Sequence, residues 1–310
     1  MTHSQPMGRT NARRAFRRRW MGKWVSVLLI FIAASMLTGV AVSHAYAAAE
    51  LDQASQQAAM VPSSEQDQMI RQAREYNRKL AKNGQYVLGE AQDPFLQLQG
   101  EQRPASETDT AYVKALNTDG DGTMGSISIP KINVDLPILH GTSLDTLDHG
   151  AGHMYGTSLP VGGTNTHSVI SAHNGMTKAL MFTNLGEMRE GDAFYLHIAG
   201  HTFAYKIDRV TKILPNDFSK LTIRKGEDRV TLMTCWPYGR NTERLLVSGL
   251  RASMPDQVPY EQDVQRQNPI IADRFALAAT GLMPCAIGYA GWTGWTYRRA
   301  AKKLPCKHKA

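Results

Sequence analysis

Three residues in the second half of the chain have side chains that together could form a nucleophilic site. Cys235 follows a predicted strand, 230–234, and precedes a loop, 236–239, with the sequence Trp-Pro-Tyr-Gly. A cysteine thiolate needs a positive partner that lowers its pKa and a base that handles protons. His173 ends another predicted strand, and Arg244 begins the strand after the cysteine loop. These residues predict a cysteine nucleophile, a histidine acid–base and a guanidinium, if the fold brings two strand ends and one strand start together.

Each of the three residues also has a purely structural interpretation. A lone cysteine is more often a small buried hydrophobe than a nucleophile. An arginine at the start of a strand is usually a solvated charge, and His173 is one of eight histidines between residues 43 and 274. Residue types alone leave both interpretations open, so the elements that hold these residues have to be considered.

The region around these residues is predicted to consist of short strands. Alternating or β-branched runs recur at close spacing, and Ala199-Gly200 between two of them is typical of a hairpin turn. The predicted strands are 127–129, 132–139, 168–172, 194–198, 202–210, 230–234 and 245–250. A short helix is predicted over 178–188 and an amphipathic helix over 63–82. Many short strands favour an all-β barrel or sandwich.

The charge of the chain is divided unevenly along the sequence. The 310 residues carry a formal net charge of +8. Residues 1–42 contain seven Lys and Arg and no acid, residues 275–310 contain six and no acid, and residues 43–274 contain 22 basic and 27 acidic side chains. A nucleic-acid-binding domain is expected to carry its positive charge on the folded part. The distribution therefore argues against a nucleic-acid partner.

Each basic end adjoins an uncharged apolar segment. Residues 25–42 form one such segment of 18 residues, and residues 275–295 form another of 21. Both are long enough to cross a bilayer, and the positive-inside rule places both chain ends in the cytoplasm. The first also resembles a signal peptide with an Ala-x-Ala cleavage site at 45–47, although its length favours an uncleaved anchor. A buried core helix is the alternative for the second.

These features predict a two-pass plasma-membrane protein with an extracellular middle part and two cytoplasmic termini. The predicted segments are a basic tail (1–24), a transmembrane helix (25–42), an extracellular helical stalk (43–119), a β-rich domain (120–254), a linker (255–274), a transmembrane helix (275–296) and a second basic tail (297–310). Cys285 lies in a predicted span and Cys306 in a tail. Cys235 is then the only extracellular cysteine, and no disulfide is expected within that part.

The sequence around the three residues resembles the sortases, a family of membrane-bound cysteine transpeptidases. Residues 231–235, Thr-Leu-Met-Thr-Cys, together with Arg244 match the Thr-Leu-x-Thr-Cys … Arg signature of that family. The segments that resemble the class C, pilin-polymerising members are 150–175, 180–192 and 235–246. The resemblance covers roughly residues 120–252. It implies a mainly β fold, a closed barrel of about eight strands with short helices, an N-terminal helix and lid region, and two flanking transmembrane helices.

The resemblance also implies a reaction and a role for each residue. Cys235 would attack the threonine carbonyl of a Leu-Pro-x-Thr-Gly-like sorting signal and form a thioester. His173 would act as general acid and then general base, and Arg244 would stabilise the oxyanion and the substrate backbone. The acyl group would pass to a lysine amine of a pilin or to a cell-wall amine. The implied partners are secreted pilins or surface proteins and the membrane, with no cofactor.

Class C sortases carry an N-terminal lid with an Asp-Pro-aromatic motif, which Asp93-Pro94-Phe95 resembles. The lid, at about 92–96, would cover the site, with Asp93 paired to Arg244 and Phe95 over Cys235. An ordinary surface turn is the alternative, since Asp-Pro is common in turns.

The chain departs from the family pattern close to each catalytic position. The histidine motif reads Ser-Ala-His-Asn-Gly over 171–175, Trp236 follows the cysteine and Glu243 precedes the arginine. The three catalytic identities are unchanged. The departures therefore bear on substrate preference and local loop packing.

Two other functions stay open at this stage. A membrane-anchored cysteine peptidase would mainly hydrolyse, because water can accept the acyl group, and a non-enzymatic pilus assembly protein would carry an inert Cys235. No metal is expected. Residues 117–122 resemble a calcium loop only faintly and lack its closing Glu, and His149 and His153 have no third ligand nearby in the sequence.

Overall fold

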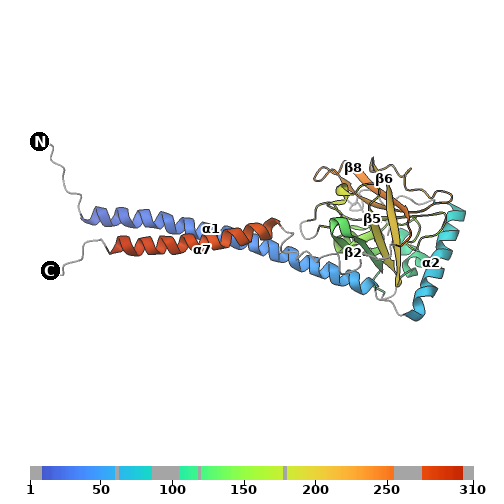
Figure 1. Cartoon of the computed structure of the whole chain (residues 1–310), viewed down its shortest axis with the longest axis horizontal. Coiled ribbons are helices and arrows are strands. Elements are labelled where there is room, and N and C mark those ends of the chain that lie inside the picture. The colour runs from blue at the N-terminus through green and yellow to red at the C-terminus, as the bar shows by residue number, and fades with distance from the viewer. Residues whose placement is uncertain are drawn as a thin grey trace. The chain divides into compact units, whose positions relative to one another are not determined.

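The computed structural model describes residues 9–59, 63–85, 105–117, 120–176, 180–254 and 274–302, and it contains a closed barrel of eight strands (Figure 1). The strands are β1 (Thr123–Ile129), β2 (Val134–His140), β3 (Ala151–His153), β4 (Thr166–Ser171), β5 (Ala193–Ile198), β6 (His201–Ile213), β7 (Asp228–Trp236) and β8 (Glu243–Arg251). Around the barrel they follow the order β1, β2, β3, β4, β7, β8, β6, β5. The predicted closed barrel of about eight strands is confirmed.

Two of the contacts between neighbouring strands are parallel. β2 pairs with β3 and β4 with β7 in parallel, whereas the other neighbours are antiparallel. Parallel neighbours need a long connection, and the one between β4 and β7 contains the whole β5–β6 hairpin. Because β4 and β7 run in the same direction, the residues that follow them leave the barrel at the same end.

Apolar side chains fill the barrel. Its fully buried members include Ile127, Ile129, Ile138, Ile170, Phe194, Leu196 and Leu232. Phe194 and Tyr205 stack across the β5–β6 pair with ring centroids 5.6 Å apart. Gly249 on β8 makes room for this stack, since a Cβ there would lie 2.9 Å from the Phe194 ring. The predicted hairpin at Ala199-Gly200 is confirmed, with φ of 46° and 72° as a two-residue turn requires.

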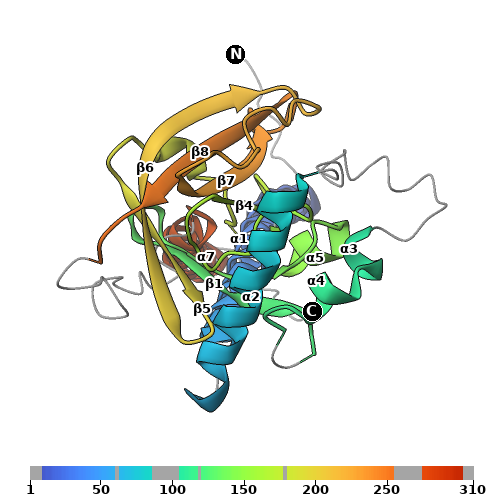
Figure 2. The same cartoon turned by 90° about the vertical axis from the view of Figure 1, so that its right-hand side faces the viewer.

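Helix α2 (Ser63–Asn83) packs on the barrel, as Figure 2 shows. Its buried side includes Ile70 and Ala73. The side-chain amide of Asn77 makes two hydrogen bonds to the backbone of Leu159. Its Nδ2 donates to the Leu159 carbonyl (3.0 Å), and its Oδ1 accepts from the Leu159 N–H (2.7 Å). The helix predicted over 63–82 is therefore confirmed. The two hydrogen bonds of Asn77 attach this helix to the backbone at Leu159.

Two short helices, α3 (Ala105–Thr108) and α4 (Thr110–Lys114), precede β1. Asp109 caps α4 by accepting hydrogen bonds from the N–H groups of Ala111 and Tyr112. Tyr112 is fully buried, and its hydroxyl lies 2.9 Å from Nδ1 of His153 and accepts from the Gly141 N–H at 3.0 Å. These contacts fix the segment before β1 to β3 and to the end of β2.

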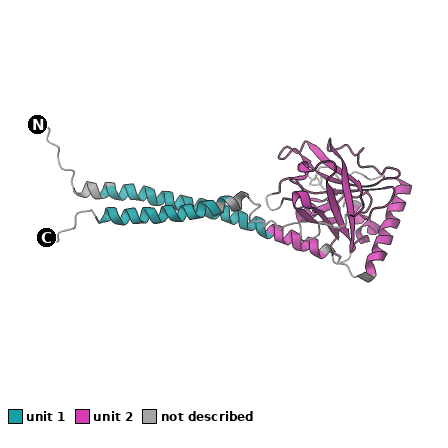
Figure 3. Cartoon of the chain, in the orientation of Figure 1, with its two compact units in different colours: residues 1–46, 266–310 teal, residues 47–265 magenta. Residues whose placement is uncertain are grey.

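The chain divides into two compact units, residues 1–46 with 266–310 and residues 47–265 (Figure 3). The first unit contains most of helix α1 (Arg9–Ala59) and helix α7 (Arg274–Ala301). Within the part of the chain that the structure describes, one helical segment, Phe16–Gln57, is long and apolar enough to cross a membrane, with a peak mean hydropathy of 2.5. The N-terminal apolar helix thus has the length and composition of a membrane anchor.

Helices α1 and α7 pack against each other within the first unit. Among the described side chains of this unit, the buried residues of α1 are Trp20, Val27, Ala34 and Ala41, at intervals of seven, and those of α7 include Ala286 and Thr293, again seven apart. The Trp20 and Tyr297 rings meet edge to face at 5.2 Å. A seven-residue repeat of mostly small side chains is typical of closely packed helices.

Three parts of the chain differ from the sequence-based predictions or lie outside the described residues. The helix predicted over 178–188 is wrong for the described residues 180–188, which contain only a 3-10 turn, η3 (Leu185–Glu187), because Met181 has a positive φ of 42° that interrupts a helix. Strand β3 was not predicted, since three residues are too few for a periodic pattern. The lid residues Asp93, Pro94 and Phe95 lie outside the described residues.

Candidate active site

Cys235 and Arg244 face each other on neighbouring strands. They are register partners in the antiparallel β7–β8 pair. Cys235 is the second-last residue of β7 and is half-buried, whereas Arg244 is the second residue of β8 and is 8% exposed. The two predicted residues are therefore brought together by backbone pairing.

His173 lies beside them because β4 and β7 end together. The parallel pairing of β4 and β7 continues past Ser171, where the Ala172 N–H donates to the Met233 carbonyl (3.2 Å) and the Thr234 hydroxyl donates to the Ala172 carbonyl (2.8 Å). One residue further, Asn174 Nδ2 donates to the Cys235 carbonyl at 2.7 Å. His173, which lies between Ala172 and Asn174, is thus held level with Cys235 on the neighbouring strand.

The guanidinium of Arg244 is oriented by backbone groups. Its NH1 donates to the carbonyls of Asn241 and Glu243, each at 3.2 Å. Among the described residues Arg244 has no acidic partner. A buried guanidinium that has no acidic partner in the described part of the chain is suited to bind a developing oxyanion or a substrate carbonyl.

An acidic residue that sequence reasoning missed lies next to His173. Oδ1 of Asp148, on helix α5 (Leu144–His149), is 3.5 Å from His173 Nε2. No sequence pattern links residues 148 and 173. The contact arises because α5 leads into β3, which pairs with the end of β4.

Aromatic side chains and glycines border the site. Trp236 packs on Gly186, where an added Cβ would lie 2.9 Å from its ring, and the Lys212 ammonium lies 5.0 Å from the Trp236 ring centroid. Tyr238 packs on Gly175, which has a φ of 87°. Trp236 is one of the departures from the family pattern of residues. Gly186 and Lys212, which lie against its ring, explain how this large side chain is accommodated.

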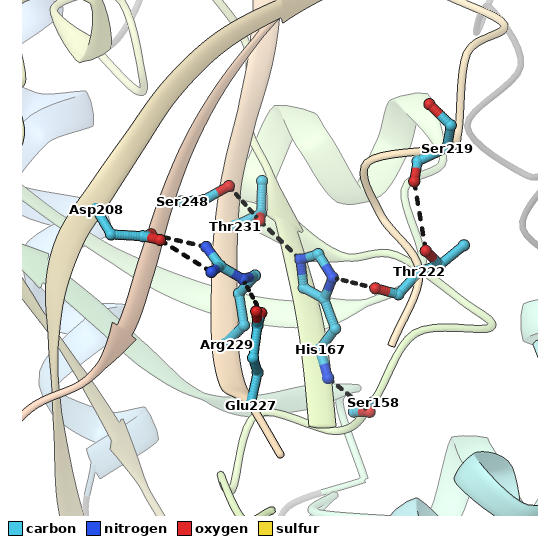
Figure 4. A network of polar contacts seen from close by, with 9 residues as sticks. All are labelled: Ser158, His167, Asp208, Ser219, Thr222, Glu227, Arg229, Thr231 and Ser248. Carbon is cyan, nitrogen blue, oxygen red and sulfur yellow. Dashed lines mark hydrogen bonds and ion pairs between the residues drawn. The ribbon is translucent and has the colours of Figure 1, made fainter. Parts of the chain in front are cut away.

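The opposite ends of β4 and β7 hold a buried polar network (Figure 4). Nε2 of His167 is 2.7 Å from the Thr231 hydroxyl, and its Nδ1 is 3.0 Å from the Thr222 carbonyl. Burial lowers the pKa of His167 to about 4, so the ring is neutral at pH 7. The Arg229 guanidinium is 3% exposed and donates to Asp208 (2.7 and 2.9 Å) and to Glu227 (2.7 Å), and its hydrogen bond lowers the pKa of Glu227.

Among the described residues no group of three or more metal-binding side chains comes together. His153, one of the two histidines considered for zinc, is fully buried with its ring nitrogens 2.9 Å from the Tyr112 hydroxyl and 2.8 Å from the Ser158 carbonyl. Burial lowers the pKa of His153 to about 4. This histidine is engaged on both ring nitrogens and serves the packing of α4.

Comparison with known proteins identifies one family. A family model described as a sortase domain matches residues 127–252, a segment that contains His173, Cys235 and Arg244. Sortase D of Bacillus subtilis is 31% identical over 152 residues, which cover 48% of this chain and 74% of that protein.

Solved structures of class C sortases are similar over nearly their whole length. Sortase C of Streptococcus pneumoniae has 36% identity and a TM-score of 0.56 over 67% of this chain and 98% of its own. Sortase C-1 of Actinomyces oris has 40% identity and a TM-score of 0.54 over 62% of this chain and 100% of its own.

Proposed function

This chain belongs to the sortase family of cysteine transpeptidases, and from that premise we propose that it polymerises pilins through Cys235, His173 and Arg244. The observation that carries the assignment of residues is the convergence of β4, β7 and β8. It gives a half-buried thiol, an arginine without an acidic partner among the described residues, and a histidine at one end of a barrel.

The reaction divides into acylation and transfer. The Cys235 thiolate attacks the threonine carbonyl of a Leu-Pro-x-Thr-Gly-like sorting signal, and Arg244 stabilises the oxyanion of the tetrahedral intermediate. The Thr–Gly bond breaks, and the His173 imidazolium protonates the leaving glycine amine. In the second half, neutral His173 takes a proton from the incoming amine, which attacks the thioester and releases Cys235.

The class of the relatives supports a pilin lysine as the acceptor. The Streptococcus pneumoniae sortase C structure is described in connection with pilin substrate specificity. A lysine amine as acceptor gives an isopeptide-linked polymer, whereas a cell-wall amine gives anchoring. The membrane location fits both, since confinement of enzyme and substrate to a surface raises their effective concentration.

We further propose that α1 and α7 both cross the membrane, with both termini in the cytoplasm. Both helices expose apolar side chains, among them Leu28, Leu29 and Met36 on α1 and Ile287 on α7. Such surfaces are stable in lipid and costly in water. The basic residues beyond each span favour the cytoplasmic side, and the seven-residue packing repeat supports a hairpin of two spans.

The test is co-expression of the full chain with candidate pilins, read as covalent high-mass ladders. We expect ladders with the wild type and with the control Cys285→Ala, and none with Cys235→Ala. Ladders that persist with Cys235→Ala would show that Cys235 is not the nucleophile. Released fragments without ladders would indicate a hydrolase instead.

A further inference from the structure

His173 makes one ion pair among the described residues, and its partner is not part of the sortase signature identified above. His173 Nε2 lies 3.5 Å from Asp148 Oδ1. The His173 side chain is 25% exposed and that of Asp148 is 61% exposed. The contact engages Nε2, and Nδ1 of the same ring makes no hydrogen bond to any described residue. Nδ1 is therefore available to exchange a proton with substrate.

The position of Asp148 is determined by buried structure. Ser143 caps α5 by accepting from the Thr146 N–H at 3.1 Å, and Leu147 is buried. Gly152 on β3 lets the helix pack closely, since an added Cβ would lie 3.1 Å from Leu147 and 3.2 Å from Thr146. The exposed carboxylate of Asp148 is therefore carried on a firmly packed turn of helix.

The strand pairing explains why this helix ends at the catalytic histidine. Gly152 on β3 is the register partner of Ser171 on β4, and the two strands are antiparallel. Asp148 precedes Gly152 and His173 follows Ser171, so both lie beyond the same end of this strand pair. The contact is a consequence of the β3–β4 ladder.

We propose that Asp148 is a positioning residue for His173. Its carboxylate faces Nε2 and orients the ring, while Nδ1 gives its proton to the leaving amine and later takes one from the incoming amine. Asp148 itself exchanges no proton, so the proton given and later regained is the one on Nδ1 of His173. The proposal rests on the assignment of His173 as the acid–base of the proposed function.

The distance and the exposure determine how large the effect is. At 3.5 Å the contact is an ion pair longer than an optimal hydrogen bond, and such contacts often shorten when substrate binds. The contact is further weakened because an exposed carboxylate is screened by solvent and salt. We therefore expect a change of about three- to tenfold in activity.

Other charged groups near the pair have to be separated from Asp148. Asp145 and His149 lie on the same helix, where Asp145 Oδ1 is 3.9 Å from His149 Nδ1. Cys235 and Arg244 lie on the neighbouring strands. Asp145→Asn is the matched control, because it removes the same charge from α5 without touching His173.

The first measurement is an NMR spectrum of the His173 ring in the full chain, with labelled histidines in detergent micelles and with Cys235→Ala to remove coupling to the thiol. Asp148→Asn is expected to move and broaden the Nε2 resonance of His173, because the carboxylate that faces this nitrogen is removed. Asp145→Asn is expected to leave this resonance unchanged. An unchanged Nε2 resonance in Asp148→Asn would overturn the proposal.

The second measurement is kinetic and uses a fluorescent sorting-signal peptide with otherwise wild-type enzyme. Asp148→Asn should lower kcat with little change in KM, and Asp148→Glu should restore much of the loss. An Asp148→Asn enzyme with wild-type kcat would again contradict the proposal. If the wild type itself transfers no acyl group, the proposed function fails, while the NMR spectrum still reports on the Asp148–His173 pair.

Discussion

Cys235 and Arg244 are register partners on two antiparallel strands, so backbone pairing places the two residues directly opposite each other. Directly opposed residues in such a ladder have Cα atoms about 4.5–5.5 Å apart. The side chain of Arg244 then needs only to be oriented, which the carbonyls of Asn241 and Glu243 do. A guanidinium placed in this way differs from an ammonium in what it can donate.

Arg244→Lys is expected to lower kcat/KM about a hundredfold. Lysine keeps the charge but loses the planar fork of donors, one of which is spent on the two loop carbonyls. The measurement is steady-state kinetics with a sorting-signal peptide. Arg240→Lys, at an exposed position in the same loop, is the control and should retain activity. Activity within threefold of the wild type for Arg244→Lys would remove Arg244 from the mechanism.

Asn174→Ala is expected to lower kcat about tenfold or more, with little change in KM. It deletes the hydrogen bond from Nδ2 to the Cys235 carbonyl, which joins the histidine segment to the cysteine strand at 2.7 Å. Small misplacements of catalytic groups are costly in rate. Thermal unfolding of the same variant checks that the fold is retained. A variant that is stable and fully active would show that Asn174 does not position the site.

Acid is expected to destabilise the catalytic unit through its buried histidines. Burial lowers the pKa of His153, His167 and His197 to about 4 each, from an ordinary value of about 6.5. Between these two pH values the unfolded chain binds more protons than the folded chain. The free energy of unfolding therefore has its full value above pH ~6.5 and falls as the pH drops towards ~4, by up to about 3 kcal/mol per histidine.

Thermal unfolding of the full chain between pH 7 and 4.5 measures this effect. His167→Gln should reduce the pH dependence by about a quarter to a third, because it removes one of three histidines with a pKa of about 4 and burial lowers the pKa of His140 as well. His149→Gln, at an exposed position, is the control and should leave the slope unchanged. A slope that is identical in His167→Gln and the wild type would contradict the assignment of His167 as neutral in the folded state.

The lid predicted from the sequence can be tested by thiol reactivity. If Asp93-Pro94-Phe95 covers the site, the double variant Asp93→Ala, Phe95→Ala should react faster with a thiol probe at Cys235. Cys285 and Cys306 must first be replaced by alanine so that one thiol is observed. A labelling rate equal to that of the enzyme with the native lid sequence would favour the surface-turn interpretation.

The two-pass topology predicts that both chain ends are protected from outside. An epitope tag after residue 310 should survive protease treatment of intact spheroplasts and be cleaved after permeabilisation. A tag inserted in the predicted linker 255–274 should be cleaved in both conditions. Cleavage of the C-terminal tag in intact spheroplasts would rule out a second span with its end in the cytoplasm.

Local sequence patterns predicted much of the barrel because most of its strands are long enough to show them. The runs that end at Cys235 and begin at Arg244 are apolar and bounded by a turn, and they form β7 and β8. Strand β3 has only three residues and no period to detect. Met181 adopts a positive φ that its residue type does not signal, so the helix predicted around it does not form in the described residues.

Sequence motifs identify some residues of the candidate site and miss others. Cys235, His173 and Arg244 are recognised by chemistry and motif, whereas Asp148 and the amide of Asn174 act through contacts between segments distant in sequence. Asp148 is brought to His173 by the β3–β4 ladder. A contact that depends on strand order cannot be read from spacing along the chain.

The buried network around His167 has a consequence for the distant active site. A slip of β4 against β7 by one residue would reverse which face each side chain occupies, and it would carry His173 away from Cys235. Such a slip would also separate His167 from Thr231 and leave buried polar groups without partners. His167 lies six residues before His173, roughly 20 Å along an extended chain. The network thereby favours the one alignment of the two strands that places His173 level with Cys235.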